Sequence, residues 1–110
     1  MEQDYNGWKN RETWATALHI DNDQVLQEIA LDYARQEIEG HDEDENINVY
    51  HLGQTFNEWI EHDLLTLENI KGNEGLWLML TDIGSLYRVN WREIAESLLE
   101  RVKEEATLNV

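Results

Sequence analysis

The side chains of this chain that could do chemistry are its histidines and its many carboxylates, which bind metal ions or transfer protons. His41 precedes a run of four acidic residues, and Asp42 and Asp44 match the alternate spacing with which a calcium loop begins. That loop requires glycine at its sixth position and glutamate at its twelfth, where this chain has Ile47 and Gly53. We therefore expect no calcium site.

Other signatures of catalysis are missing as well. Glu58 and His62 lie four residues apart, but a zinc site of the HExxH type needs a second histidine. The chain has no cysteine, and it shows no glycine-rich phosphate loop or serine nucleophile motif. The sequence therefore predicts a protein that is not an enzyme and that uses no cofactor and no metal.

The charge of the chain is its most informative property. A formal net charge of -16 on 110 residues comes from 24 Asp and Glu against 8 Lys and Arg. The few cations are scattered, which argues against direct nucleic-acid binding. Such an excess of acid steers a basic partner toward the protein, most strongly at low salt. A general need for solubility explains the same composition, and this alternative stays open.

Two predicted helices carry their carboxylates on one side. At 100° per residue, one stripe spans about 40° of the helix surface and the other about 80°. Stems of carboxylates one turn apart are about 5 to 6 Å from each other, comparable to the spacing of nucleic-acid phosphates. We expect these stripes and one acidic loop to bind the partner, although any amphipathic helix in so acidic a chain presents an acidic solvated face. The stripes are Asp21, Glu28, Asp32 and Glu39, and Glu93, Glu96, Glu100 and Glu104; the loop is Asp42, Glu43, Asp44 and Glu45.

The N-terminal segment concentrates aromatic residues and offers an alternative partner surface made of Trp8, Arg11 and Trp14. Aromatic and arginine side chains dominate protein interfaces. The interpretation that we favour is structural: both tryptophans plug one end of a helical bundle, Arg11 pairs with Glu12, and residues 6–7 form a turn.

Helix signals position these residues. Asn90 is expected to cap a helix that runs to about residue 103, with Glu93 as the reciprocal partner of a capping box and with Val89 and Ile94 as a hydrophobic staple. Asn10 is expected to begin a short first helix that places Trp14 and Leu18 on one face.

Three further helices are expected between these two. One begins at residues 21–23 and buries a face that contains Val25, Leu26, Ile29, Ala30 and Tyr33. A central helix buries Val49, Leu52, Phe56, Trp59, Ile60, Leu64 and Leu67. Gly53 lies on its apolar side, where the missing side chain allows a neighbour to approach. Residues 69–73 are expected to form a turn. Residues 76–83 are expected to form a short buried helix that contains Leu76, Trp77, Met79, Leu80 and Ile83.

These elements predict an all-α fold, a small helical bundle of about five helices in one domain that spans residues 1–110. The chain contains no proline to interrupt helices. Its N-terminus lacks an apolar run and its longest apolar stretch, residues 76–80, is too short to span a bilayer, so we expect a cytoplasmic protein that does not bind membranes. Five tryptophans on a small chain leave a homodimer open.

Three strings of sequence carry a resemblance. YNGWKNRETW at residues 5–14, LHIDND at residues 18–23 and VNWREIAESLLE at residues 89–100 resemble a family of small uncharacterised proteins from phage, plasmid and archaeal genomes. This chain has His19 where that family is expected to have tryptophan. The resemblance implies an origin in mobile elements and no catalytic mechanism.

Acidity and this resemblance together favour a counter-defence inhibitor carried by a phage or mobile element. By composition the chain is similar to the acidic DNA mimics among anti-CRISPR and anti-restriction proteins. We expect it to bind the basic nucleic-acid-binding surface of a host defence complex, with a CRISPR effector favoured over a restriction enzyme. The alternative is a non-enzymatic interaction or regulatory module, such as a phage accessory or antitoxin-like protein, that binds through Trp8, Arg11 and Trp14.

Overall fold

The computed structural model describes residues 5–39 and 48–108, and this part of the chain is helical. It contains no strand and only an isolated bridge between Tyr5 and Trp8, so the all-α prediction is confirmed. None of the helices in this part is long and apolar enough to cross a membrane. The elements are α1 (Arg11–Asn22), α2 (Gln24–Glu39), α3 (Val49–Asn57), the π-helical η1 (Glu58–Leu64), α4 (Leu67–Ile70), α5 (Glu74–Ile83), the 3-10 turn η2 (Leu86–Arg88) and α6 (Trp91–Leu108).

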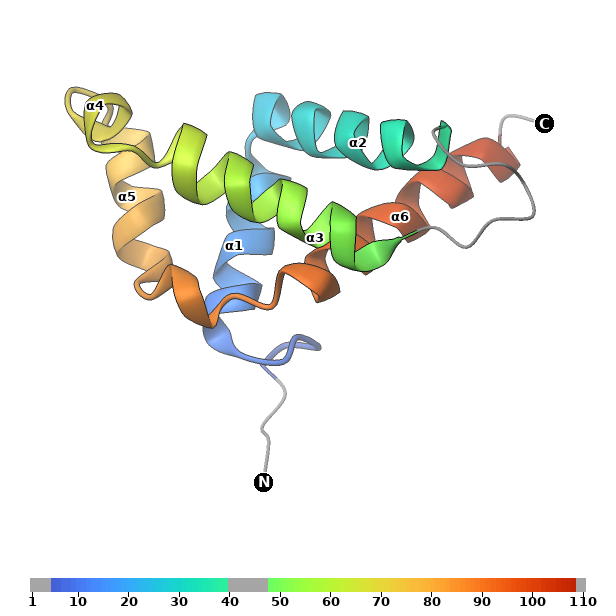
Figure 1. Cartoon of the computed structure of the whole chain (residues 1–110). Helices are drawn as coiled ribbons and strands as arrows, with labels where there is room; N and C mark the ends of the chain where they lie inside the picture. Colours follow the sequence, from blue (N-terminus) through green and yellow to red (C-terminus); the bar gives the residue numbers. More distant parts are fainter. Residues whose placement is uncertain (1–4, 40–47, 109–110) are drawn as a thin grey trace.

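The helices pack in a flattened arrangement that measures 43 × 37 × 23 Å. Helix α6 packs most extensively against α3 and also contacts α2, while α1 packs against α2 and α5 (Figure 1). Figure 1 shows α3 crossing the molecule, with α5 toward one end, α6 toward the other and α1 between them. Because the body is thin, α2 and α6 each keep a long side exposed to solvent.

Side-chain caps begin the helices where the sequence predicts them. The Asn10 side chain accepts a hydrogen bond from the Thr13 backbone N–H (2.8 Å), and that of Asn90 accepts one from Glu93 N–H (3.1 Å). Asp23 accepts a hydrogen bond from Val25 N–H (2.9 Å) at the start of α2. These caps satisfy N–H groups that have no partner within a helix.

The capping box predicted for α6 is only half formed, because the backbone N–H of Asn90 does not bond the Glu93 carboxylate. The Glu93 carboxylate accepts a hydrogen bond from the backbone N–H of Lys9 (3.0 Å), and the N–H of Asn90 donates to Thr13 Oγ1 (2.8 Å). Thr13 is fully buried, and its hydroxyl also bonds Asn10 Oδ1 (2.7 Å). One threonine therefore links the caps of α1 and α6.

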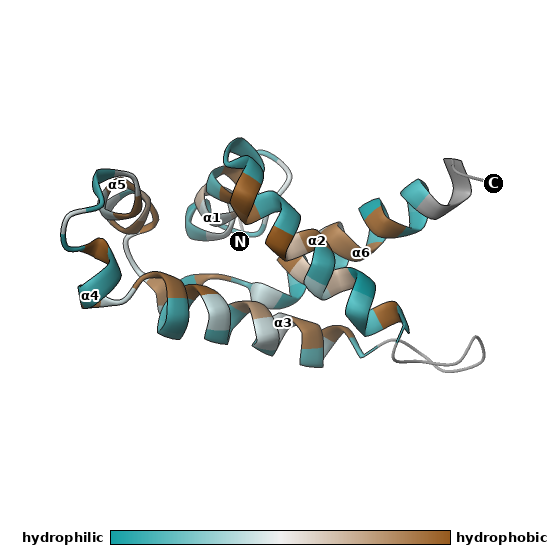
Figure 2. Ribbon diagram, turned by 90° about the horizontal axis from the view of Figure 1, so that it is seen from above, coloured by the Kyte–Doolittle hydropathy of each residue, from teal (hydrophilic) through white to brown (hydrophobic). Residues whose placement is uncertain are grey.

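The core collects buried side chains from α1, α2, α3, η1, α5 and α6. Figure 2 shows the pattern on α3, where hydrophilic residues lie on the side turned away from α1 and α2. Two expected core positions are wrong: Val25 is 66% exposed and Leu67 is 84% exposed. Helix α1 lies close to several other helices, and most of its buried residues are small. Its buried residues are Thr13, Ala15, Thr16, Ala17 and Ile20.

The central helix departs from its expected course after Asn57. From Glu58 to Leu64 it widens into a π-helix, and Leu65 N–H bonds the carbonyl of Ile60 five residues earlier (2.9 Å). The wider turn changes the helical register, so Leu65 is buried. The chain then leaves the helix, and the one-turn α4 follows, partly where residues 69–73 were expected to form a turn.

Gly53 confirms the predicted close approach of a neighbouring element. A Cβ atom added there would lie 3.2 Å from the backbone nitrogen of Arg92 and 3.2 Å from the carbonyl carbon of Trp91. Glycine fits here without strain, whereas a larger residue would press on backbone atoms of α6 rather than on a flexible side chain.

Candidate functional site

The first predicted stripe does not lie on a single helix. Asp23 has extended backbone angles and separates α1 from α2, so Asp21 belongs to the end of α1. The Asp21 carboxylate accepts a hydrogen bond from Arg101 of α6 (2.7 Å). Asp21 is therefore committed to an ion pair within the molecule, and the stripe on α2 is reduced to Glu28, Asp32 and Glu39.

These three α2 carboxylates are exposed and differ in their contacts. Asp32 pairs with Arg35 on the same helix (3.1 Å) and keeps 65% of its side chain exposed. Glu28 and Glu39 make no ion pair with any other described residue. Helical spacing places all three within about 40° of each other around α2.

The stripe on α6 is divided into a structural part and an exposed part. Glu93 is partly buried and receives the N–H of Lys9, whereas Glu96 pairs with Arg92 one turn away (3.0 Å). Farther along the helix, Glu100 and Glu104 are exposed and make no ion pair within the described part of the chain. The second half of α6 therefore carries the carboxylates that remain accessible to a partner.

Arg35 joins the acidic sides of α2 and α6. Its guanidinium donates to Asp32 on its own helix and to Glu105 on α6 (2.9 Å). The hydrogen bond to Glu105 raises the pKa of Arg35 above its usual value, with a smaller effect of Asp32, so the guanidinium stays charged. One cation thus holds two helices together at a point where their carboxylates would otherwise repel each other.

The predicted loop of Asp42, Glu43, Asp44 and Glu45 lies outside the described residues. A second group of carboxylates, around α4 and its neighbours, was not among the predicted partner-binding residues. They make no ion pair among the described residues, and the signal that could have found them is their density from the end of the predicted central helix to the start of the next one. They are Glu58, Glu61, Asp63, Glu68 and Glu74.

The N-terminal aromatic residues pack against the body of the protein. Trp8 and Trp14 are partly buried against the core, and the rings of Trp14 and Tyr5 lie 5.0 Å apart. Asn6 and Gly7 have positive φ angles of 50° and 89°, which are typical of a two-residue hairpin turn. The turn and the two buried tryptophans agree with the structural interpretation of this segment.

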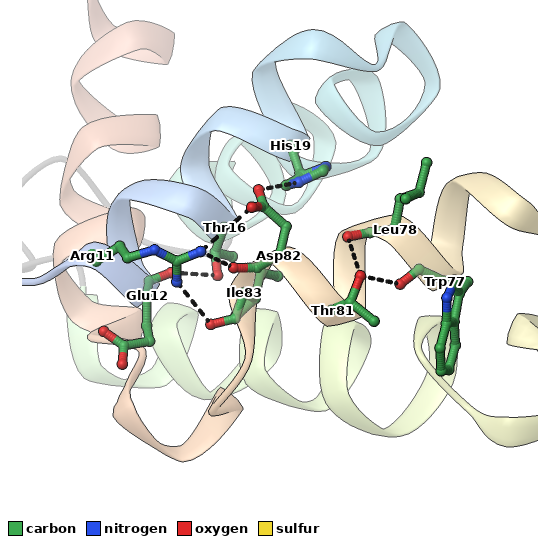
Figure 3. Close-up of polar contacts among 9 residues, drawn as sticks. All are labelled: Arg11, Glu12, Thr16, His19, Trp77, Leu78, Thr81, Asp82 and Ile83. Atoms are coloured by element: carbon green, nitrogen blue, oxygen red, sulfur yellow. Dashed lines mark hydrogen bonds and ion pairs between the residues drawn. The ribbon is translucent and has the colours of Figure 1, made fainter.

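Arg11, the third residue of the alternative surface, is occupied within the molecule. Its guanidinium bonds the side chain (3.4 Å) and the backbone carbonyl of Asp82 and reaches the carbonyl of Ile83 (3.5 Å), at the end of α5 (Figure 3). His19 Nε2 lies 2.8 Å from the same Asp82 carboxylate. The expected pair of Arg11 with Glu12 is wrong, because Glu12 pairs with Arg88 (3.2 Å).

Helix α5 also leaves apolar side chains at the surface. Trp77 is 53% exposed and Leu78 is 54% exposed, and their side chains point in opposite directions (Figure 3). Trp77 was expected to be buried, and this prediction is wrong, because the continuous apolar run of α5 hides which of its members face outward. Neither residue belonged to the partner surfaces predicted from the sequence.

Comparison with known proteins gives one match. A model of a family of unknown function (DUF7249) matches residues 1–105, which is nearly the whole chain. No curated protein and no solved structure matches it.

Proposed function

The chain belongs to the DUF7249 family, and we propose that it is a non-catalytic inhibitor that binds the basic nucleic-acid-binding surface of another protein. The observation that carries this proposal is the set of accessible carboxylates on α2 and α6. Four of them are exposed and make no ion pair among the described residues: Glu28, Glu39, Glu100 and Glu104.

A rigid array of carboxylates suits this role. Lysine and arginine side chains that hold phosphates form charge-assisted hydrogen bonds with carboxylates equally well. Residues on helices are already ordered, so binding costs less conformational entropy than it would for a flexible acidic segment. The pairing of Arg35 with Glu105 keeps the two helices in one arrangement and supports such an array.

The partner that we propose is a defence complex of the host cell, with a CRISPR effector favoured over a restriction enzyme. The motifs at residues 5–14 and 89–100 support a mobile-element origin, because they resemble proteins of phage and plasmid genomes. In this account the protein acts stoichiometrically in the host cytoplasm, occupies the channel of the complex, and touches neither nucleic acid nor membrane.

The N-terminal surface gains little support as an alternative. Trp8 and Trp14 pack on the core, and Arg11 is bonded to the end of α5. A partner that used these side chains would have to break contacts that hold α1 in place. The acidic carboxylates require no such rearrangement.

The experiment that tests the proposal is a binding assay with purified defence complexes. A panel of CRISPR effectors and restriction enzymes is mixed with labelled target DNA, and bound DNA is measured while the protein is added. The proposal expects at least one complex to lose DNA binding at a stoichiometric ratio, with less inhibition at high salt. Undiminished DNA binding across the panel would contradict it.

A further inference from the structure

A cavity of about 470 Å³ lies between α3, η2 and the start of α6. Its lining includes three of the eight cations of the chain, Lys9, Arg88 and Arg92, and no carboxylate. The three cations stand at the exposed rim, whereas Gly53 and Val89 are buried at the floor. In a protein with a net charge of -16, a cavity lined by three cations and no carboxylate is unusual; Glu12 and Glu96 pair with two of these cations from outside the lining.

Both arginines at the rim keep donors for a ligand. Arg88 uses its Nε to bond Glu12 (3.2 Å), and Arg92 uses its Nε to bond Glu96 (3.0 Å). Their side chains are 55% and 71% exposed, and their Nη groups make no hydrogen bond to any described residue. The two carboxylates hold the arginines in place, and the remaining N–H groups form the planar fork that binds phosphate or carboxylate oxygens.

One residue that lines the cavity has a buried acceptor without a partner. Asn57 lines it, and the Oδ1 atom of Asn57 is buried with no hydrogen-bond donor from the described residues. A buried polar atom of this kind costs about 1 to 3 kcal/mol when it stays unsatisfied. If the Asn57 side chain turned toward the cavity, a donor supplied by a ligand would remove that cost.

We propose that this cavity binds a phosphorylated small molecule of about the size of a mononucleotide. The phosphate lies on Arg88 and Arg92. The Asn57 side chain turns toward the cavity when the ligand binds, and a hydroxyl or amino group of the ligand donates to its Oδ1 atom. The cavity volume falls in the range of about 300 to 1,000 Å³ that is usual for small-molecule sites. Tyr50, which is 68% exposed, and the partly buried Trp91 supply aromatic surface for the rest of the ligand. This inference does not depend on the proposed function.

The proposal is tested by titrating the whole chain with adenosine 5′-monophosphate, inorganic phosphate, adenosine and succinate, followed by amide NMR shifts. We expect saturable binding of the monophosphate, with shifts at Gly53 and Arg92, and binding of adenosine at least tenfold weaker. Arg88→Gln and Arg92→Gln should each weaken monophosphate binding about tenfold, the loss expected for one charge-assisted contact. The control Arg101→Gln, which also removes an ion pair but lies outside the cavity, should stay within twofold.

A variant of Asn57 gives a second readout. Asn57→Leu removes the unsatisfied acceptor, so we expect the protein without ligand to be as stable as the wild type or more stable. The same variant should bind the monophosphate about tenfold more weakly but bind inorganic phosphate equally well. The proposal is overturned if phosphate and the monophosphate show no saturable binding up to about 10 mM. Equal affinity for succinate, or equal losses in Arg92→Gln and Arg101→Gln, would also overturn it.

Discussion

The guanidinium of Arg35 on α2 bonds the carboxylate of Glu105 on α6 across 2.9 Å, at the place where two acidic helices pack together. The same guanidinium bonds Asp32, so one cation lies between two anions from different helices. Such a bridge costs little desolvation, because the side chains of Arg35 and Glu105 are 36% and 42% exposed. It sets the relative position of the carboxylates to which we assign partner binding.

Arg35→Gln is expected to lower the free energy of unfolding by about 0.5 to 1 kcal/mol at low salt, the usual range for a partly exposed ion pair. Removing the cation also leaves Asp32 and Glu105 to repel each other, so the loss should shrink as salt is added. Urea unfolding at two salt concentrations measures both effects. Arg92→Gln, which breaks a more exposed pair within one helix, serves as the control and should cost less. Equal losses in both variants, independent of salt, would refute the bridging role.

Gly53→Ala should destabilise the protein by about 1 to 3 kcal/mol, although alanine is the better helix former. The added Cβ would meet backbone atoms of Trp91 and Arg92 at 3.2 Å, so α3 and α6 would have to move apart. Gly75→Ala is the matched control, since its Cβ would meet only the side chain of Asn73 at 3.4 Å. Thermal unfolding should show a lower Tm for the first variant and an equal or higher Tm for the second. A Gly53→Ala protein as stable as the wild type would show that the helices do not approach this closely.

Thr13→Val should cost about 1 to 3 kcal/mol, because it leaves the partly buried N–H of Asn90 without its acceptor. Thr16→Val is the control: Thr16 is also fully buried, but its hydroxyl bonds only the carbonyl of Glu12 in the same helix. We expect the control to lose less than half as much stability in urea unfolding. If the two variants are equally stable, the link between the caps of α1 and α6 contributes nothing.

Arg11→Gln distinguishes the two partner surfaces. The substitution removes the bonds that tie α1 to the end of α5, so a modest loss of stability of about 1 kcal/mol is expected. Inhibition of the target complex should stay within twofold of the wild type, measured well below the unfolding temperature. A tenfold loss of inhibition by a folded Arg11→Gln protein would favour the N-terminal surface over the acidic helices.

Features that depend on residues close together along the chain could be predicted from the sequence. The caps at Asn10, Asp23 and Asn90 were predictable because a capping side chain bonds an N–H only two or three residues away. The close approach at Gly53 was predictable from a glycine on an apolar face. The commitment of Asp21 to an ion pair was not predictable, since its partner Arg101 is 80 positions away and meets it only in the folded protein.

Features that depend on tertiary contacts were not predicted. The π-helical segment after Asn57 changes the helical register. Leu67 was expected to be buried on the basis of a regular α-helix, and it is exposed instead. The pairs Arg11 with Asp82 and Arg101 with Asp21 join residues 71 and 80 positions apart. The same holds for the cavity that gathers Lys9, Arg88 and Arg92, because cations that are scattered in the sequence meet only after folding.

The most direct test of the central claim is the association rate of the protein with the complex that it inhibits, measured for two charge-reversal variants at low and high salt. The first variant replaces the accessible carboxylates of α2 and α6 by lysine, at Glu28, Glu39, Glu100 and Glu104. The second makes the same change in net charge at Glu58, Asp63, Glu68 and Glu74, which are also exposed. We predict that the first variant associates at least tenfold more slowly and with a weaker salt dependence, and that the second stays much closer to the wild type. Equal rates for the two variants, or a loss only in the second, would contradict the assignment of partner binding to α2 and α6.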